Sequence, residues 1–163
     1  MSTNDDERFL TAAISLAVDN VTNDGGPFGA VIVTGDGQAF DGVNRVTANN
    51  DPTAHAEVMA IRNACTALGT FDLSGSTLYT SCEPCPMCLS AALWARVETV
   101  VYAADRFDAE QAGFDDAVFY NFFTTPVEER SMPVRHFVPA AGSSIPATAP
   151  FDAWRSLAAR VDY

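Results

Sequence analysis

Two short motifs, His-Ala-Glu at residues 55–57 and Pro-Cys-Pro-Met-Cys at residues 84–88, constrain this chain more than any other feature. Cys85 and Cys88 are three residues apart, so on the first turn of a helix their sulfur atoms share one face. A helix N-terminus also favours thiolate over thiol, through its unpaired N–H groups and its dipole. With Pro86 as the first helical residue, the motif predicts Cys85 at the helix cap and Cys88 in the first turn. Such a pair is half of a zinc site.

A third metal ligand is expected from histidine, and the chain contains two histidines. His55 lies at the start of another predicted helix, for which Asp51 is the expected cap and Pro52 the expected first residue. Two helices that follow strands in an α/β layer can start at the same edge of the sheet, so His55 can meet the cysteine pair. Three protein ligands would leave a fourth position open, as in catalytic rather than structural zinc sites. His136, near the C-terminus, is predicted to be a surface or packing residue.

Glu57 follows His55 by two residues, so near a helix start its carboxylate can approach a water molecule on the metal. Zinc lowers the pKa of such a water toward neutrality. A carboxylate there can take a proton from the water and hand it to a leaving group. For an average glutamate a solvated helix position is the simpler interpretation, but the two motifs together favour the catalytic one.

Other interpretations of the thiols fit the sequence less well. Cys65 falls on an apolar helical stripe and is predicted to pack in the core. Cys82, at the end of a predicted strand, is expected to be a buried neighbour of the site rather than a ligand. An iron–sulfur cluster would need a further cysteine after Cys88, and a redox pair would leave the His-Ala-Glu motif unexplained.

Composition limits the class of protein and its partners. The chain has 163 residues, of which 48% are apolar and 18% charged, and we expect one domain over residues 1–163. The net charge is −12 and all nine basic residues are arginines, so a nucleic acid polymer is a poor partner. No apolar run approaches the roughly 18 residues needed to span a membrane, and the acidic start does not resemble a secretory signal. We therefore expect a cytoplasmic protein with reduced thiols.

Helical stripes alternate with buried strands along the chain. Strands are predicted at residues 30–33, in a segment that ends near residue 44, and at residues 76–81, 99–104 and 134–138. Helices are predicted at residues 5–21, from residue 52 onward, from residue 86 to about residue 96, and at residues 151–163. A linker that contains several prolines, at residues 139–150, precedes the last helix. This alternation predicts a three-layer α/β/α domain with a central mixed five-stranded sheet flanked by helices.

The His-Ala-Glu and Pro-Cys-Pro-Met-Cys motifs together resemble the zinc signature of the nucleobase and nucleoside deaminases. More of the chain resembles the bacterial guanine deaminases of the cytidine and deoxycytidylate deaminase superfamily. The similar segments are GGPFGAVIV (25–33), NRVTANNDPTAHAEVMAIR (44–62), LYTSCEPCPMCLSAALWAR (78–96), YAADRFDAEQAGFDD (102–116) and FDAWRSLAARVDY (151–163). The resemblance implies a cytidine-deaminase-like fold with one zinc ion per subunit.

The resemblance also implies a reaction, the hydrolysis of guanine to xanthine and ammonia in guanine catabolism. Zinc-bound hydroxide would attack carbon 2 of the ring, and Glu57 would protonate a ring nitrogen and then the departing amine. Asp116 matches a carboxylate that helps to recognise the substrate and assists proton transfer. Asp115 is adjacent, and only the resemblance assigns the role to Asp116.

Further positions are implied to bind the substrate. Asn44 matches a base-binding asparagine, whose amide both donates and accepts hydrogen bonds. Phe28 matches an aromatic residue that stacks on the base. The backbone of Ala56 and the terminal Tyr163 also align with pocket positions. In this family the C-terminal segment crosses to a partner subunit and closes its site, which implies a homodimer with exchanged, domain-swapped C-terminal segments.

Several functions stay open from the sequence alone. Another small amino-heterocycle or a nucleoside, such as guanosine, cytosine or ammeline, would use the same chemistry. A tRNA adenosine deaminase shares the motifs, but the net charge disfavours an RNA backbone. A zinc-stabilised binding module without catalysis would instead close the metal site with a fourth ligand and would not need Glu57. A free base is favoured over a nucleoside, because a tail that seals the pocket would exclude a ribose.

Overall fold

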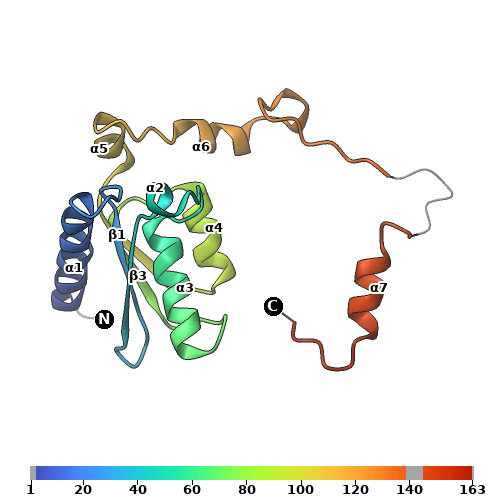
Figure 1. Ribbon diagram of the computed structural model, residues 1–163, viewed down its shortest axis with the longest axis horizontal. Coiled ribbons are helices and arrows are strands. Elements are labelled where there is room, and N and C mark those ends of the chain that lie inside the picture. The colour runs from blue at the N-terminus through green and yellow to red at the C-terminus, as the bar shows by residue number, and fades with distance from the viewer. Residues whose placement is uncertain (1–2, 139–144, 163) are drawn as a thin grey trace. The chain divides into compact units, whose positions relative to one another are not determined.

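The computed structural model describes residues 3–138 and 145–162. The chain divides into two compact units, Met1–Asn121 and Phe122–Tyr163. The first unit contains a sheet with helices on both of its faces (Figure 1). Tyr163, for which a substrate-binding role was predicted, lies outside the described residues, as does part of the predicted linker.

The strands and helices of the first unit follow in the order expected for an α/β domain. The strands are β1 (Gly29–Val33), β2 (Ala39–Val43), β3 (Thr77–Cys82) and β4 (Thr99–Ala104). The helices are α1 (Thr3–Val21), α2 (Val46–Asn49), α3 (Ala56–Leu68), α4 (Pro86–Trp94), α5 (Arg106–Gln111) and α6 (Ala117–Thr124), of which α6 runs across the boundary into the second unit.

The sheet is mixed and four-stranded, with the strand order β2-β1-β3-β4. β1 pairs with both β2 and β3 in antiparallel fashion, and β3 pairs with β4 in parallel. The expectation of a fifth strand at residues 134–138 was wrong, because the structure shows no strand there. The side chain of Phe137 in this segment is 84% exposed. An apolar run becomes a strand only where a neighbouring strand offers backbone partners, and among the described residues none pairs with this segment.

Two buried clusters, one on each face of the sheet, confirm the layered α/β architecture. Alternate residues of a strand point to opposite faces, and all five residues of β1 are buried. Ala30 and Ile32 pack in the cluster that also holds the buried faces of α3 and α4. Val31 and Val33 pack in the cluster beneath α1. The sheet therefore fixes α3 and α4 on the same side, opposite α1 (Figure 1).

The starts of α3 and α4 decide where the functional side chains lie. α4 begins as predicted, with Cys85 as its N-cap and Pro86 as its first residue. The prediction for α3 was wrong, because the helix begins at Ala56 with His55 as its N-cap. The Asp51 carboxylate instead accepts a hydrogen bond of 2.8 Å from the backbone N–H of Thr53 and closes a local turn. Aspartate readily makes such turns, which compete with helix capping.

β2 lies unusually close to the first turn of α3. A Cβ atom at Gly42 would stand 2.2 Å from the carbonyl oxygen of Ala56 and 2.3 Å from the backbone nitrogen of Ala60. Real Cβ atoms do not approach backbone atoms so closely, so only glycine allows this packing. Gly42 thus sets the distance between the sheet and the N-terminus of α3.

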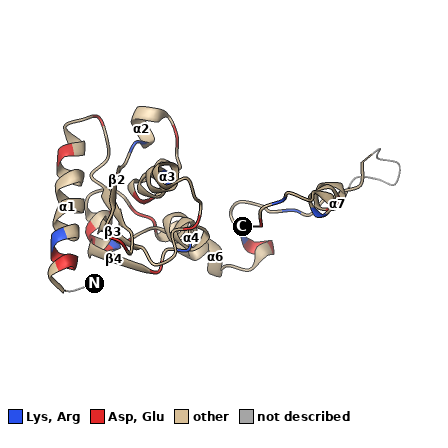
Figure 2. Ribbon diagram, turned by 90° about the horizontal axis from the view of Figure 1, so that it is seen from below, with Lys and Arg blue, Asp and Glu red and all other residues tan. Residues whose placement is uncertain are grey.

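The second unit contains a short 3-10 helix, Val127–Glu129, and α7, Ala149–Ser156. α7 starts before the predicted residue 151 and ends at residue 156, well before the chain terminus. No helix in the described ranges has both the length and the apolar character needed to cross a membrane. Acidic residues are distributed over many elements and outnumber the arginines (Figure 2).

Candidate active site

Three side chains from the starts of α3 and α4 converge as predicted. The Sγ atom of Cys85 lies 3.7 Å from Nδ1 of His55 and 3.7 Å from Sγ of Cys88. Cys88 Sγ lies 3.5 Å from the same Nδ1 atom. A tetrahedral zinc ion, with bonds of about 2.3 Å to sulfur and about 2.0 Å to nitrogen, requires separations of about 3.8 Å between sulfurs and about 3.5 Å between sulfur and nitrogen. All three sides of this triangle therefore fit zinc.

The local backbone explains why these side chains are available to a metal. His55 and Cys85 are both N-cap residues in the extended conformation, so each side chain projects beyond the end of its helix. An N-cap side chain usually accepts a bond from its own helix, but neither His55 nor Cys85 does so. The N-termini of both helices also favour negative charge, which suits thiolate ligands.

Hydrogen bonding within the triangle places negative charge on one sulfur. The pKa of Cys85 is lowered to about 4, first because of its side-chain hydrogen bond with Cys88 and then because of its contact with His55. The same bond to Cys85 is the largest cause of the raised pKa of Cys88. A thiolate is the form of cysteine that binds zinc, so Cys85 is ready to bind the ion, and Cys88 must release its proton when the metal binds.

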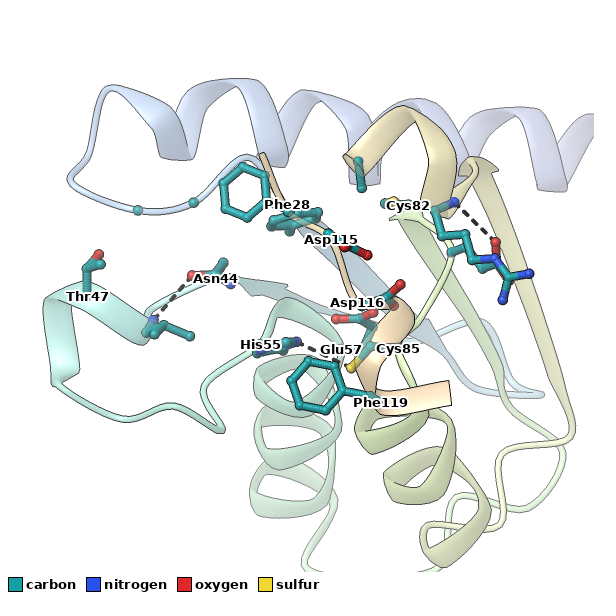
Figure 3. Close-up of a pocket in the computed structure, with 17 residues that line it drawn as sticks. Phe28, Asn44, Thr47, His55, Glu57, Cys82, Cys85, Asp115, Asp116 and Phe119 are labelled. Carbon is teal, nitrogen blue, oxygen red and sulfur yellow. Dashed lines mark hydrogen bonds between the residues drawn. The ribbon is translucent and has the colours of Figure 1, made fainter. Parts of the chain in front are cut away.

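Glu57 is buried beside this triangle, with only 6% of its surface exposed. Burial is the main cause of its raised pKa, and the negative charge of Cys85 adds to the shift. Figure 3 shows Glu57 together with His55, Cys85 and Asp116 at the cavity. A buried carboxyl group with a raised pKa is suited to accept and donate protons.

A cavity of about 420 Å³ opens in front of the metal triangle, within the usual range for small-molecule sites. The predicted substrate-binding residues Phe28, Asn44 and Asp116 all line it, as does Glu57. Ala56 does not line the cavity through its side chain, which is fully buried in the core. The sequence therefore located three of the predicted substrate-binding side chains at the cavity wall.

The two adjacent aspartates differ in environment. Asp115 is exposed, and its carboxylate accepts a hydrogen bond of 2.8 Å from the backbone N–H of Ala117 at the start of α6. Asp116 is half-buried, and both residues line the cavity. Burial raises the pKa of Asp116, and the negative charge of Cys85 raises it further, whereas Arg106 opposes both effects.

Asn20, at the end of α1, has a role that sequence reasoning missed. Its buried amide donates hydrogen bonds of 2.9 Å to the carbonyl oxygen of Gly26 and 2.8 Å to that of Asn44. A Cβ atom at Gly25 would collide with this amide at 2.1 Å, so glycine is required there. The signal in the sequence was a polar residue within an apolar helical stripe, five residues before two consecutive glycines.

Aromatic side chains beyond Phe28 also shape the cavity. The rings of Phe28 and Phe114 pack edge to face, with centroids 5.0 Å apart. Phe114 and Phe119 line the cavity as well, and neither was identified from the sequence. Their contribution depends on the fold of residues 105–121, which brings both side chains to the cavity.

The remaining cysteines and the second histidine lie where they were expected. Cys82 is buried at the cavity wall, and its thiol donates to the carbonyl oxygen of Asp105 at 3.5 Å rather than joining the metal triangle. Burial raises the pKa of Cys82 to about 11. Cys65 packs against the core, and His136 is exposed.

The fold and the metal triangle agree with a comparison of the sequence with known families. Residues 3–104 match the model of the cytidine and deoxycytidylate deaminase zinc-binding region. The chain therefore belongs to the cytidine and deoxycytidylate deaminase family, and His55, Cys85 and Cys88 are its zinc ligands.

Comparison with individual proteins gives more specific similarities within this family. The guanine deaminase of Bacillus subtilis is 49% identical over 158 residues, which cover 96% of this chain and 98% of the relative. Its X-ray structure has a TM-score of 0.88 and covers 100% of this chain and 99% of that one, at 48% identity. A structure of the guanine deaminase from Nitrosomonas europaea has a TM-score of 0.63 at 36% identity, over 66% of this chain and 63% of that one.

A relative with a different name is similar over a smaller part of the chain. The tRNA-specific adenosine deaminase of Bacillus subtilis is 40% identical over 99 residues, which cover 61% of this chain and 62% of the relative. The similarity to the guanine deaminase of the same organism extends along almost the whole of both chains.

Proposed function

We propose that this chain is a zinc-dependent guanine deaminase, which hydrolyses guanine to xanthine and ammonia. The observation that carries the proposal is the similarity to the Bacillus subtilis guanine deaminase along 96% of the chain. The zinc triangle and the buried Glu57 beside it supply the chemistry that this reaction needs.

Proton transfer is the task of Glu57. Zinc held by His55, Cys85 and Cys88 supplies Lewis acidity, which makes water acidic near neutral pH. Glu57 in its carboxylate form accepts the proton of the attacking water, because burial raises the pKa of its carboxyl group and makes the carboxylate a stronger base. It then delivers this proton to a ring nitrogen, takes up the second proton of the same water and delivers it to the departing amine. Asp116, half-buried at the cavity wall, recognises the base and assists the departure of ammonia.

The base is held by an amide, a ring and a helix N-terminus. The Oδ1 atom of Asn44 accepts a hydrogen bond of 3.2 Å from the backbone N–H of Val46, which leaves the amide NH₂ group for a purine acceptor. Phe28 offers the face of its ring for stacking on the base. Ala56 is the first residue of α3, so its backbone N–H has no partner within the helix and can donate to the substrate.

The C-terminal segment completes the proposal. We infer that the protein is a homodimer in which each C-terminal segment, with Tyr163, closes the site of its partner. Phe151 and Leu157, in and just after α7, are 64% and 51% exposed within one chain, so this segment needs an apolar surface to cover. The exchange would also exclude a ribose and so select the free base over the nucleoside.

A panel of substrates tests the activity. Zinc-loaded protein would be incubated with guanine, guanosine, adenine, cytosine and ammeline, and the ammonia released would be measured. We expect turnover of guanine above all others. Turnover of another compound without turnover of guanine would overturn the assignment of the substrate and leave the mechanism standing.

Glu57→Gln is the matched variant for this panel. An enzyme that uses Glu57 for proton transfer keeps its zinc in this variant and loses turnover by about 10²–10⁴-fold. A zinc-stabilised binding module would keep its zinc and show no turnover in either form of the protein.

Mixed dimers test the exchange. A Glu57→Gln chain would be combined with a chain that ends at residue 150, and neither homodimer should be active. If the segments are exchanged, the mixed dimer contains one complete site and recovers part of the activity. A monomer in light scattering, or no recovery in mixed dimers, would contradict the exchange.

A further inference from the structure

Beside the cavity, four residues that are not metal ligands form a closed ring of contacts. The backbone N–H of Arg106 donates a hydrogen bond of 3.1 Å to the carboxylate of Glu83. The guanidinium group of Arg106 lies over the ring of Tyr120, 4.7 Å from its centroid. The hydroxyl of Tyr120 donates a hydrogen bond of 3.2 Å to the carbonyl oxygen of Pro84. Glu83 and Pro84 are consecutive, so the ring is complete.

This ring joins the metal-binding segment to the helix that follows the second carboxylate. Pro84 directly precedes the zinc ligand Cys85, and Tyr120 lies in α6, one turn after Asp116. The carbonyl oxygen of Asp116 accepts a hydrogen bond of 2.9 Å from the backbone N–H of Phe119, so Asp116 is tied to that first turn. Movement of Tyr120 would therefore move Asp116 relative to Cys85.

Arg106 has the properties needed to hold this ring together. It is half-buried, and it is the one arginine among the described residues that line the cavity. A guanidinium group stacks on an aromatic ring through its flat face, which a lysine cannot reproduce. Its positive charge also faces a carboxylate-rich wall, since Glu83, Asp115 and Asp116 line the same cavity.

We propose that Arg106 is a positioning residue for deamination, which, through its contact with Tyr120, holds Asp116 in place toward the substrate. The inference rests on the proposed function, because it takes Asp116 to be the carboxylate that meets the base. Arg106 itself does not touch the reacting atoms. Its effect on turnover depends on Asp116. A residue that only stabilises the fold would affect turnover independently of Asp116.

The test is a double-mutant cycle in the zinc-loaded enzyme. Arg106→Met is expected to lower kcat/KM by about 10–100-fold when Asp116 is present, mainly through kcat. In the Asp116→Asn background the same substitution should have less than about a twofold further effect, because nothing remains for Arg106 to position. Binding of the product xanthine, measured by calorimetry on the same four proteins, gives a second cycle that does not depend on turnover.

Control variants distinguish the positioning of Asp116 by Arg106 from an effect of Arg106 on the stability of the protein. Arg8 lies over the ring of Phe9 at 4.9 Å in α1, away from the cavity, so Arg8→Met removes an equivalent contact and should leave kcat/KM unchanged. Tyr120→Phe keeps the aromatic ring beneath Arg106 and loses only the hydrogen bond to Pro84. Its effect on kcat/KM should therefore be smaller than that of Arg106→Met. Zinc content should remain one ion per chain in all variants. Arg106→Lys, which folds with the same charge, should recover less than half of the loss.

Two results would overturn the inference. One is an equal effect of Arg106→Met with and without Asp116, which would indicate a general structural role. The other is wild-type turnover in Arg106→Met while Asp116→Asn is impaired. If instead Asp116→Asn alone has no effect on turnover or on xanthine binding, the assignment of Asp116 in the proposed function fails, and the inference fails with it.

Discussion

The Sγ atom of Cys88 lies 3.5 Å from Nδ1 of His55, although the two residues are 33 positions apart in the sequence. Their proximity depends on α3 and α4 packing closely on one face of the sheet. Small residues make this possible, since Ala60 and Ala64 of α3 and Ala92 of α4 are buried in the same cluster. The metal centre is thus a consequence of alanine packing between two helices as much as of the ligands themselves.

Zinc content should distinguish a cysteine that binds zinc from one that does not. Cys85→Ala removes a ligand from the triangle and should abolish stoichiometric zinc binding. Cys82→Ala should retain one zinc ion per chain, because the Cys82 thiol donates to Asp105 and lies outside the triangle. The measurement is metal analysis of purified protein after dialysis. Loss of zinc from Cys82→Ala would show that the fourth position is not open.

Asn20→Ala should weaken both the fold and substrate binding. The substitution leaves the buried carbonyl groups of Gly26 and Asn44 without their donor, which should cost about 1–3 kcal/mol of unfolding free energy. Because Asn44 is held by this bond, KM should rise more than kcat falls. Urea unfolding and steady-state kinetics provide the two measurements.

A matched control for this prediction lies on the same segment. The amide of Asn23 donates to the carbonyl oxygen of Asp19 at 2.8 Å but is exposed. Asn23→Ala should therefore change the unfolding free energy by no more than about 0.5 kcal/mol. Equal losses in the two variants would contradict the importance of buried carbonyl groups.

Gly42→Ala should disturb the approach of β2 to α3. The added methyl group would meet backbone atoms of Ala56 and Ala60 at 2.2 and 2.3 Å, and neither atom can move without shifting the helix. We expect a loss of about 1–3 kcal/mol or more in unfolding free energy, together with weaker zinc retention, because His55 directly precedes Ala56. At Gly35 the nearest atom is 3.4 Å away, so Gly35→Ala is the control and should have little effect.

The rate at which Cys82 is alkylated should rise with pH over an unusually high range. Only the thiolate is alkylated, and burial raises the pKa of this thiol from an ordinary value of 9.0 to about 11. The thiol therefore stays protonated at neutral pH, and its rate of alkylation should keep rising until the pH nears 11. Mass spectrometry of the zinc-loaded protein after treatment with iodoacetamide would measure this rate. A plateau near pH 9 would show that the thiol is not buried as described.

The parts of the fold that depend on local pattern were predictable from the sequence. Pro86 placed at the first position of a helix fixed Cys85 as its cap, and β4 was predicted with its observed bounds. Asp51 misled the prediction of α3, because an aspartate before proline can close a turn as well as cap a helix. The run at residues 134–138 had the residues of a strand, but pairing requires a neighbour that a local pattern cannot reveal.

The site was predictable where a motif or a resemblance pointed to it. His55 and Glu57 came from a short motif with known chemistry, and Asn44 came from the family resemblance. Asn20 and Arg106 were missed, because each contacts segments far away in the sequence. A polar residue in such a position looks like any other until its partners are known.

The match to the deaminase family ends at residue 104, where β4 ends, and the cavity wall formed by Arg106, Phe114, Asp116 and Phe119 begins just beyond it. The zinc ligands and Glu57 therefore lie within the matched stretch, whereas the cavity wall combines both stretches, since Phe28 and Asn44 also line it. Substitutions between residues 106 and 119 can therefore reshape part of the cavity wall while the zinc ligands and Glu57 stay unchanged.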